Sequence, residues 1–210
     1  MLAIFKREFK SYFQNVIGWL FVAALLAVYG LYFYVYNLKN GYPYISYDLN
    51  GIGFIMMIAV PILTMRSLSD EKKTKTDQLM LTSPVSVGKI VAGKYFAMAA
   101  VYTIDIALFA LSPLVLSIYG KVALSEAYVA LFGYWLYGLS CIAVGLFISS
   151  ISESVIISAI LTFTALFLSY MMQSITGLIS SSGNLLTKVL NCFDLYTPFE
   201  NFVSGCFSVT

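Results

Sequence analysis

Histidine is absent from this 210-residue chain, and cysteine and charge are scarce. Without histidine there can be no imidazole zinc site, no Ser-His-Asp triad and no histidine general base. The three cysteines, Cys141, Cys192 and Cys206, form no C-x-x-C pair, so the common zinc-ribbon and thiol-redox motifs are absent as well. We therefore expect no catalytic residue and no metal site in this chain.

The low charge content identifies the class of protein. Only 10% of the residues are charged and 60% are hydrophobic, and the mean hydropathy is +0.87. A soluble domain is about 25% charged and about 45–50% apolar. Because this number of charged side chains is too small to cover the surface of a soluble protein of this size, we expect an integral membrane protein. The net charge of +2 gives no reason to expect binding to nucleic acid.

Apolar stretches predict the membrane-spanning helices. A bilayer core about 30 Å thick is crossed by roughly 20 apolar residues in a helix. The predicted spans are residues 16–36, 51–65, 95–119, 127–150 and 154–173. The aromatic run at the end of the first span, residues 29–36, is typical of a belt at the membrane interface. The predicted fold is all-α, a polytopic helical membrane protein with five visible transmembrane helices, the last two forming a tight hairpin.

The positions of lysine and arginine predict the orientation. Nine of them precede the first span or lie between the second and third, and only Lys39, Lys121 and Lys188 fall on the other side. Cytoplasmic loops carry the excess of basic residues, so the N-terminus is predicted to be cytoplasmic. Five spans place residues 174–210 outside. We expect this outer segment to precede a sixth span that the sequence does not contain, as in a truncated chain.

The N-terminal segment, residues 1–14, has an amphipathic pattern. Leu2, Phe5, Phe9 and Phe13 recur at helical spacing, and basic residues occupy the other faces. Such a helix lies in the headgroup plane of a membrane. We predict an interfacial elbow helix that takes part in the protein's motion; the alternative is a positively charged flank that only fixes the topology.

The inner loop, residues 66–94, holds nine of the charged residues. Within it, residues 76–81 can form a short helix, capped by Thr74 or Thr76 and prevented from continuing by Pro84. One interpretation is a surface helix whose lysines contact anionic lipid. The other is a coupling helix that docks a cytoplasmic partner. The candidate docking residues are Glu71, Thr76, Asp77, Gln78, Leu79, Met80 and Leu81.

The order of these elements resembles the permease of type-2 ABC transporters. The loop is similar to that family's pattern in Glu71-Lys72, Thr76-Asp77-Gln78-Leu79, Pro84-Val85-Ser86 and Gly93-Lys94, as is 145–150 at the end of the fourth span. The likeness covers nearly the whole chain and is strongest to bacterial permeases of gliding-motility and copper-maturation systems. The chain departs from the family in two respects, with Lys75 where glycine is common and with no sixth span.

The resemblance implies a single permease domain over residues 1–210, in a bacterial inner membrane. It implies two permeases, identical or homologous, with the substrate path between them, and two cytoplasmic ATPase subunits. This chain has no G-x-x-x-x-G-K-[ST] loop, so ATP and Mg²⁺ are expected on the separate ATPase and no cofactor on this chain. The family favours export. The alternatives are an ATP-independent secondary transporter and a membrane anchor without transport.

Asp105 is the acidic residue within a predicted span. A carboxylate at this depth costs about 2.5–3.5 kcal/mol on the insertion scale and usually faces a partner or a wet cavity. Two roles follow from the sequence. Asp105 either lines a substrate or ion pathway, or accepts a hydrogen bond from a tyrosine, serine or threonine of a neighbouring span.

Overall fold

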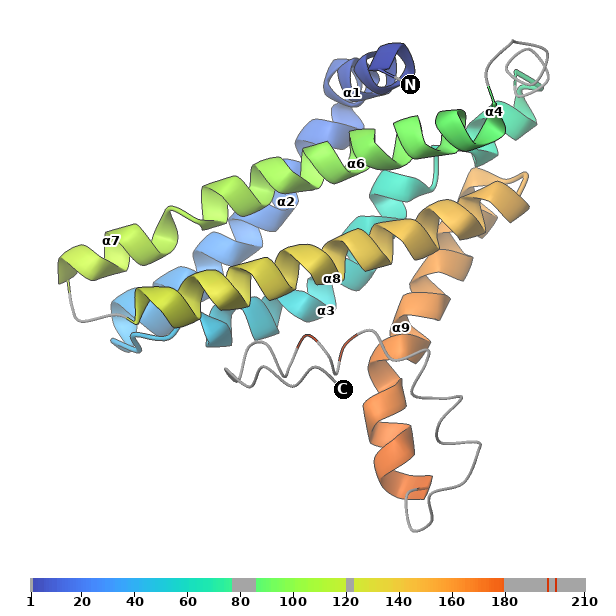
Figure 1. Cartoon of the computed structure of the whole chain (residues 1–210). Coiled ribbons are helices and arrows are strands. Elements are labelled where there is room, and N and C mark those ends of the chain that lie inside the picture. The colour runs from blue at the N-terminus through green and yellow to red at the C-terminus, as the bar shows by residue number, and fades with distance from the viewer. Residues whose placement is uncertain (1, 77–85, 120–122, 180–195, 197–198, 200–210) are drawn as a thin grey trace.

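The described part of the chain consists of helices joined by short turns. Figure 1 shows the computed structural model, which describes residues 2–76, 86–119, 123–179, 196 and 199. The elements are α1 (Leu2–Gln14), α2 (Val16–Phe33), the π-helix η1 (Tyr34–Lys39), α3 (Ser46–Thr64), α4 (Ser69–Lys73), α6 (Val87–Phe109), α7 (Ser112–Tyr119), α8 (Leu124–Ile151) and α9 (Val155–Ile179). No strand occurs among these residues, and the predicted all-α fold is confirmed.

Among the described residues, four helical stretches are long and apolar enough to cross a membrane. They are Val16–Lys39, Ser46–Lys73, Val87–Tyr119 and Leu124–Ile151, and they include the first four predicted spans. The fifth predicted span falls on α9, in which Val155–Met171 is an apolar helix within the part whose side chains the structure describes. The count of five spans therefore stays a prediction. The hairpin is confirmed, since three residues separate α8 from α9.

The boundaries of two helices differ from the predicted ones. The predicted third span begins at Tyr95, but α6 begins at Val87, so eight residues assigned to the inner loop are helical. Ser86 is extended and ends the preceding loop, and no proline or β-turn signal follows it until Pro113. The same span is interrupted after Phe109. It resumes as α7 with Pro113 in its first turn, where the missing N–H of proline leaves no helical bond unmade.

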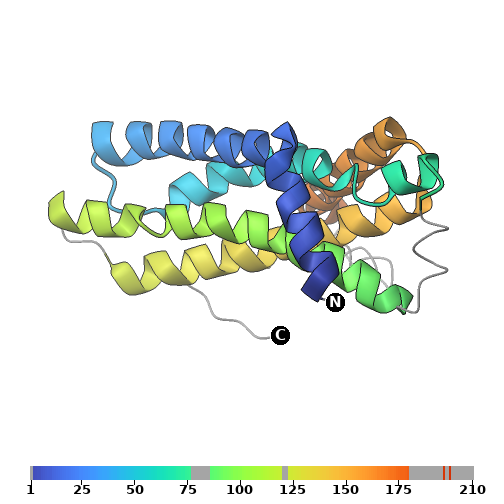
Figure 2. The ribbon, with the colours of Figure 1, turned by 90° about the horizontal axis from the view of Figure 1, so that it is seen from above.

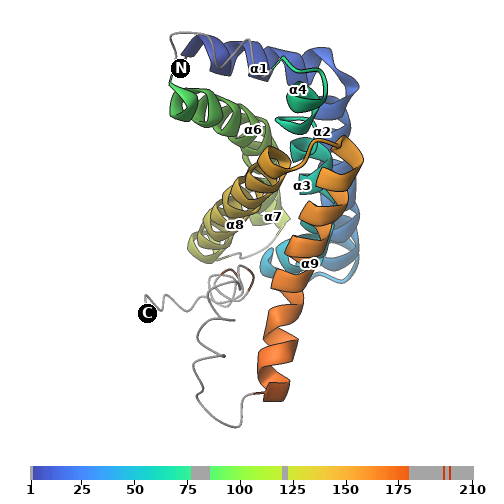
Figure 3. The same ribbon diagram turned by 90° about the vertical axis from the view of Figure 1, so that its right-hand side faces the viewer.

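The long helices lie side by side, and two helices depart from them. α2, α3, α6 and α8 run lengthwise against one another. Viewed from above, α1 crosses α6 steeply at one end of this bundle (Figure 2). α9 packs on α3 and α8 near the same end and then diverges from them (Figure 3). The segments predicted to be inner, namely α1, α4 and the α8–α9 turn, thus gather at one end, which we call the inner end.

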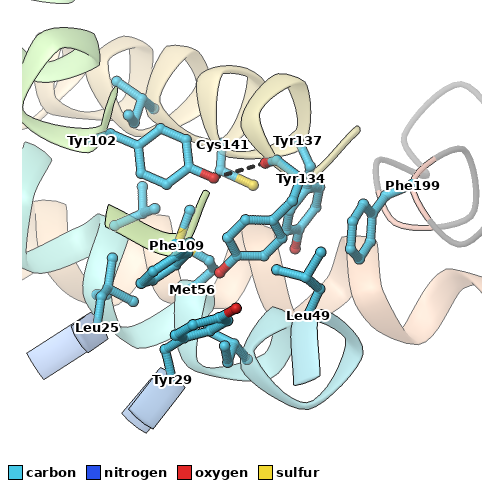
Figure 4. Packing of buried hydrophobic residues seen from close by; sticks show 14 of the residues in the cluster. Leu25, Tyr29, Leu49, Met56, Tyr102, Phe109, Tyr134, Tyr137, Cys141 and Phe199 are labelled. Carbon is cyan, nitrogen blue, oxygen red and sulfur yellow. Dashed lines mark hydrogen bonds between the residues drawn. The ribbon is translucent and has the colours of Figure 1, made fainter. Parts of the chain in front are cut away.

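Aromatic side chains fill the middle of the bundle (Figure 4). The ring of Phe109 stacks on that of Tyr29 with 4.1 Å between centroids. The Tyr102 hydroxyl donates a hydrogen bond to the Tyr134 carbonyl at 2.7 Å and so joins α6 to α8. Gly138 lies against the Tyr102 ring, where a Cβ atom would overlap it. Tyr29 is therefore a core residue, and its assignment to the interfacial belt was wrong.

Candidate coupling site

A buried lysine at the inner end connects three helices. Lys94 of α6 is 2% exposed. Its ammonium lies 2.6 Å from Glu71 Oε1 of α4 and 3.5 Å from Glu8 Oε1 of α1. It also donates a hydrogen bond to the Ser67 carbonyl at 2.8 Å. A single side chain thus holds the N-terminal helix and the start of the inner loop against a predicted membrane span.

Arg7 completes the charge balance around Lys94. The Arg7 guanidinium lies 2.7 Å from Glu8 Oε1 and 3.8 Å from Glu71 Oε1. We call Arg7, Glu8, Glu71 and Lys94 the inner ion-pair cluster; it contains two cations and two anions. A buried charge whose partner is removed costs about 3–5 kcal/mol, so Glu71 and Lys94 hold each other in place. Arg7 is largely exposed and contributes less.

The start of α4 is anchored on the end of α8. The backbone N–H groups of Leu68 and Ser69 both donate to the Ser149 hydroxyl at 3.2 Å. The first N–H groups of a helix have no partner within it, and Ser149 satisfies them from another helix. The Lys72 ammonium donates to the Ser150 carbonyl at the C-terminus of α8, where a cation also favours the helix dipole. Residues 145–150, which carry part of the family resemblance, therefore hold α4.

The end of α4 is closed by a Schellman motif. The N–H of Thr76 bonds to the Glu71 carbonyl at 3.0 Å, and that of Lys75 to the Lys72 carbonyl at 3.1 Å. Lys75 has a φ of 56°, a conformation that glycine adopts without cost. Lys75 is also the position at which the family resemblance leads us to expect glycine. This motif fixes the backbone at the end of α4 up to Thr76, which is the first residue of the predicted docking segment.

The predicted docking residues fall into two groups. Glu71 and Thr76 are described: Glu71 belongs to the inner ion-pair cluster, and Thr76 caps α4 through its backbone. Asp77, Gln78, Leu79, Met80 and Leu81 lie outside the described residues, as does the predicted helix that they form. Thr74 also serves α4, since its hydroxyl bonds to the Asp70 carbonyl at 2.8 Å. The docking role of these residues stays a prediction.

Tyr12 adds a neutral contact between α1 and the end of α3. Burial, with a smaller contribution from the nearby carboxylate of Glu8, raises the pKa of its hydroxyl. The hydroxyl therefore keeps its proton and donates to the Leu63 carbonyl at 3.4 Å. α1 is thus held by charge at Glu8 and by a hydrogen bond at Tyr12.

Asp105 lies far along α6 from the inner ion-pair cluster. Its side chain is fully buried, and neither carboxylate oxygen accepts a hydrogen bond from any described residue. The hydroxyl of Tyr134, a core neighbour on α8, likewise has no partner there. Both predicted roles of Asp105 remain open. The described residues also contain no group of three acidic or cysteine side chains close enough to hold a metal ion.

The sequence did not predict that Lys94 is buried or that Glu8 takes part in this site. From the sequence, Lys94 was only part of the family-like Gly93-Lys94 pair and one of the basic residues predicted to lie on the inner side. The signal that could have found it is its position at the start of an apolar helix, where a buried cation requires an anion.

Most of the chain matches the model of a known protein family. The sequence model of the family described as ABC-2 family transporter protein matches residues 32–207 of the chain. No curated protein and no solved structure matches the chain. The matched region includes α3, α4, α6 and α8, and therefore Glu71, Lys94 and Ser149.

Proposed function

Because this chain belongs to the ABC-2 family of transporter proteins, we propose that it is the membrane subunit of an ATP-driven exporter whose ATPase is a separate polypeptide. The family and the four long apolar helices make it a multi-pass membrane permease. ATP hydrolysis, the cytoplasmic position of the inner end and the bacterial inner membrane are parts of the proposal. So is a kinship with gliding-motility and copper-maturation permeases.

The inner ion-pair cluster is the observation that carries this proposal. Residues 76–81, the predicted docking segment, follow α4 directly. α4 in turn is fixed to α1 and α6 through Lys94 and to α8 through Ser149. A force applied to the docking segment therefore reaches the elbow helix and two spans through short polar contacts. A surface loop that contacts only lipid has no need of such an attachment.

The mechanism follows from these attachments. Closure of the ATPase dimer on ATP would displace the docking segment and α4 with it. Because Glu71 holds Lys94, the inner end of α6 moves with α4, and α1 follows through Glu8. The spans would then alternate between inward-facing and outward-facing arrangements. The substrate path would lie between this permease and a second copy or a homologue.

The proposal is tested by affinity purification of the chain from its own membranes in mild detergent. We expect a P-loop ATPase to co-purify and to show vanadate-sensitive ATP hydrolysis. Deletion of residues 76–81 should remove the ATPase while the chain still inserts in the membrane. A control deletion of residues 41–44, in the turn at the opposite end of the bundle, should leave the ATPase bound.

Two results would contradict the proposal. A folded chain that purifies without any nucleotide-binding protein would favour secondary transport or an anchoring role. An ATPase that stays bound and fully active after deletion of 76–81 would place the docking surface elsewhere.

A further inference from the structure

A polar pocket of about 430 Å³ opens beside the inner ion-pair cluster. Binding pockets for small ligands are commonly about 300–1,000 Å³, so this volume accommodates a phospholipid headgroup. The pocket is bordered by the second half of α1, the α1–α2 corner, the turn between α3 and α4, and Lys94 of α6. Its charged lining residues are Arg7, Glu8, Arg66, Asp70, Glu71 and Lys94.

The helix ends fix the depth of this pocket in the membrane. Ile17 lies in the first turn of α2, and Arg66 lies two residues beyond the end of α3. Both α2 and α3 belong to stretches that are apolar enough to span the bilayer. A pocket formed where two spans meet the interface is at the level of the lipid headgroups.

Two of the lining charges have no side-chain partner among the residues that the structure describes. Lys94, Glu8, Glu71 and Arg7 are engaged with one another in the inner ion-pair cluster. Arg66 and Asp70 form no ion pair and no side-chain hydrogen bond with any described residue. Within the described part of the chain, the pocket therefore has one unpaired cation and one unpaired anion, and its six charges sum to zero. Such a pair of opposite charges is complementary to a zwitterionic ligand.

We propose that the pocket binds the headgroup of a phosphatidylethanolamine-type phospholipid, with its phosphate on Arg66 and its ammonium on Asp70. Arginine suits the phosphate because its planar guanidinium donates two parallel hydrogen bonds to it. A primary ammonium has three N–H donors for a carboxylate, whereas the quaternary ammonium of choline has none. An anionic glycerol headgroup would leave the carboxylate of Asp70 without a cation. This inference needs only that the chain spans a membrane and is independent of the ATPase.

The bound lipid would sit between α1 and the α3–α4 turn. Both border the pocket, and both are tied to Lys94. A lipid in this position would keep the elbow helix at the headgroup level and would stabilise the inner ion-pair cluster.

The test is native mass spectrometry of the full chain, released from nanodiscs that contain equal amounts of phosphatidylethanolamine and phosphatidylglycerol. We expect one phosphatidylethanolamine to be retained in preference. Replacement of phosphatidylethanolamine by phosphatidylcholine should reduce retention about tenfold, because the hydrogen bonds to a charged group are lost. This comparison uses the wild-type chain and does not depend on the folding of a variant.

Variants then locate the site. Arg66→Gln and Asp70→Asn should each reduce retention about tenfold. Lys10→Gln and Glu126→Gln remove exposed charges that do not line the pocket and should leave retention unchanged. Equal retention of phosphatidylglycerol, unaffected by Asp70→Asn, would overturn the proposal in favour of a simple anion site. Absence of any retained lipid on the folded wild-type chain would overturn it as well, as would a partner protein that occupies the pocket in its place.

Discussion

Lys94 and Glu71 are 23 residues apart in the sequence, but the Lys94 ammonium is 2.6 Å from the Glu71 carboxylate and almost wholly buried. The same ammonium reaches Glu8, 86 residues earlier. This contact converts the inner loop from a connection between two spans into a part of the helical bundle. The proposed transmission of force from an ATPase depends on it.

Removal of Lys94 should destabilise the inner end. Lys94→Met leaves the carboxylates of Glu71 and Glu8 without their buried cation, and we expect a loss of about 3–5 kcal/mol in the free energy of unfolding. Thermal unfolding of the purified chain in detergent measures this loss. Lys89→Met, at an exposed site on the same helix, should melt as the wild type does. Equal melting of the two variants would show that the buried pair contributes nothing.

Lys75→Gly should stabilise the chain. The φ of 56° at Lys75 costs a residue with a side chain about 1–2 kcal/mol, and glycine avoids most of this cost at the C′ position of a Schellman motif. In contrast, Lys73→Gly replaces the last residue of α4, which keeps the helical conformation, and should destabilise the helix by up to about 0.5–1 kcal/mol. The two melting temperatures should therefore shift in opposite directions. A fall in both would contradict the left-handed conformation at Lys75.

Gly138→Ala should disrupt the aromatic core. A Cβ at this position overlaps the Tyr102 ring, which the hydrogen bond to Tyr134 holds in place. Overpacking of this kind costs about 1–3 kcal/mol, and a lower melting temperature would report it. Gly88→Ala is the matched control, because a Cβ at Gly88 meets no atom within 4 Å. If the two variants melt alike, Tyr102 is not packed against α8 as described.

Ser149→Ala should loosen α4 from α8. The variant loses the hydroxyl that accepts from two backbone N–H groups at the start of α4, and loss of a capping side chain costs about 0.5–2 kcal/mol. Hydrogen exchange of the Leu68 and Ser69 amides should rise accordingly. Ser140→Ala removes an exposed hydroxyl that bonds only within α8 and should leave both amides protected.

Asp105→Asn tests the two roles of the buried acid. Because no described residue donates a hydrogen bond to the carboxylate, we expect the melting temperature to stay unchanged. A pathway role predicts lower vanadate-sensitive ATP hydrolysis by the complex with the ATPase. A lower melting temperature with full ATP hydrolysis would instead show a structural role and exclude the pathway.

The sequence predicted the features that depend on local properties of the chain. The positions of the first four spans follow from the length and hydropathy of continuous segments, and the structure confirms the helices there. The predicted start of α6, Tyr95, was wrong because the charges of Lys89 and Lys94 placed both residues in the loop. A lysine continues a helix as readily as leucine does, and α6 simply extends beyond its apolar portion.

The inner ion-pair cluster could not be predicted in the same way. Its members come from three elements, and only tertiary packing brings Glu8, Glu71 and Lys94 together. The motifs of the family resemblance include Glu71 and Lys94, but they do not indicate that the two side chains form an ion pair. Tyr29 was misplaced for a related reason, since an aromatic residue near the end of a span serves equally well in an interfacial belt or against Phe109 in the core.

The most direct measurement of the proposed coupling is photo-crosslinking in intact membranes. A photoreactive amino acid would replace Leu79, in the predicted docking segment, or Tyr44, an exposed residue at the opposite end of the bundle. We predict an adduct between position 79 and a P-loop ATPase, and none from position 44. If position 79 yields no ATPase adduct, or if both positions yield the same one, the inner loop is not the docking site.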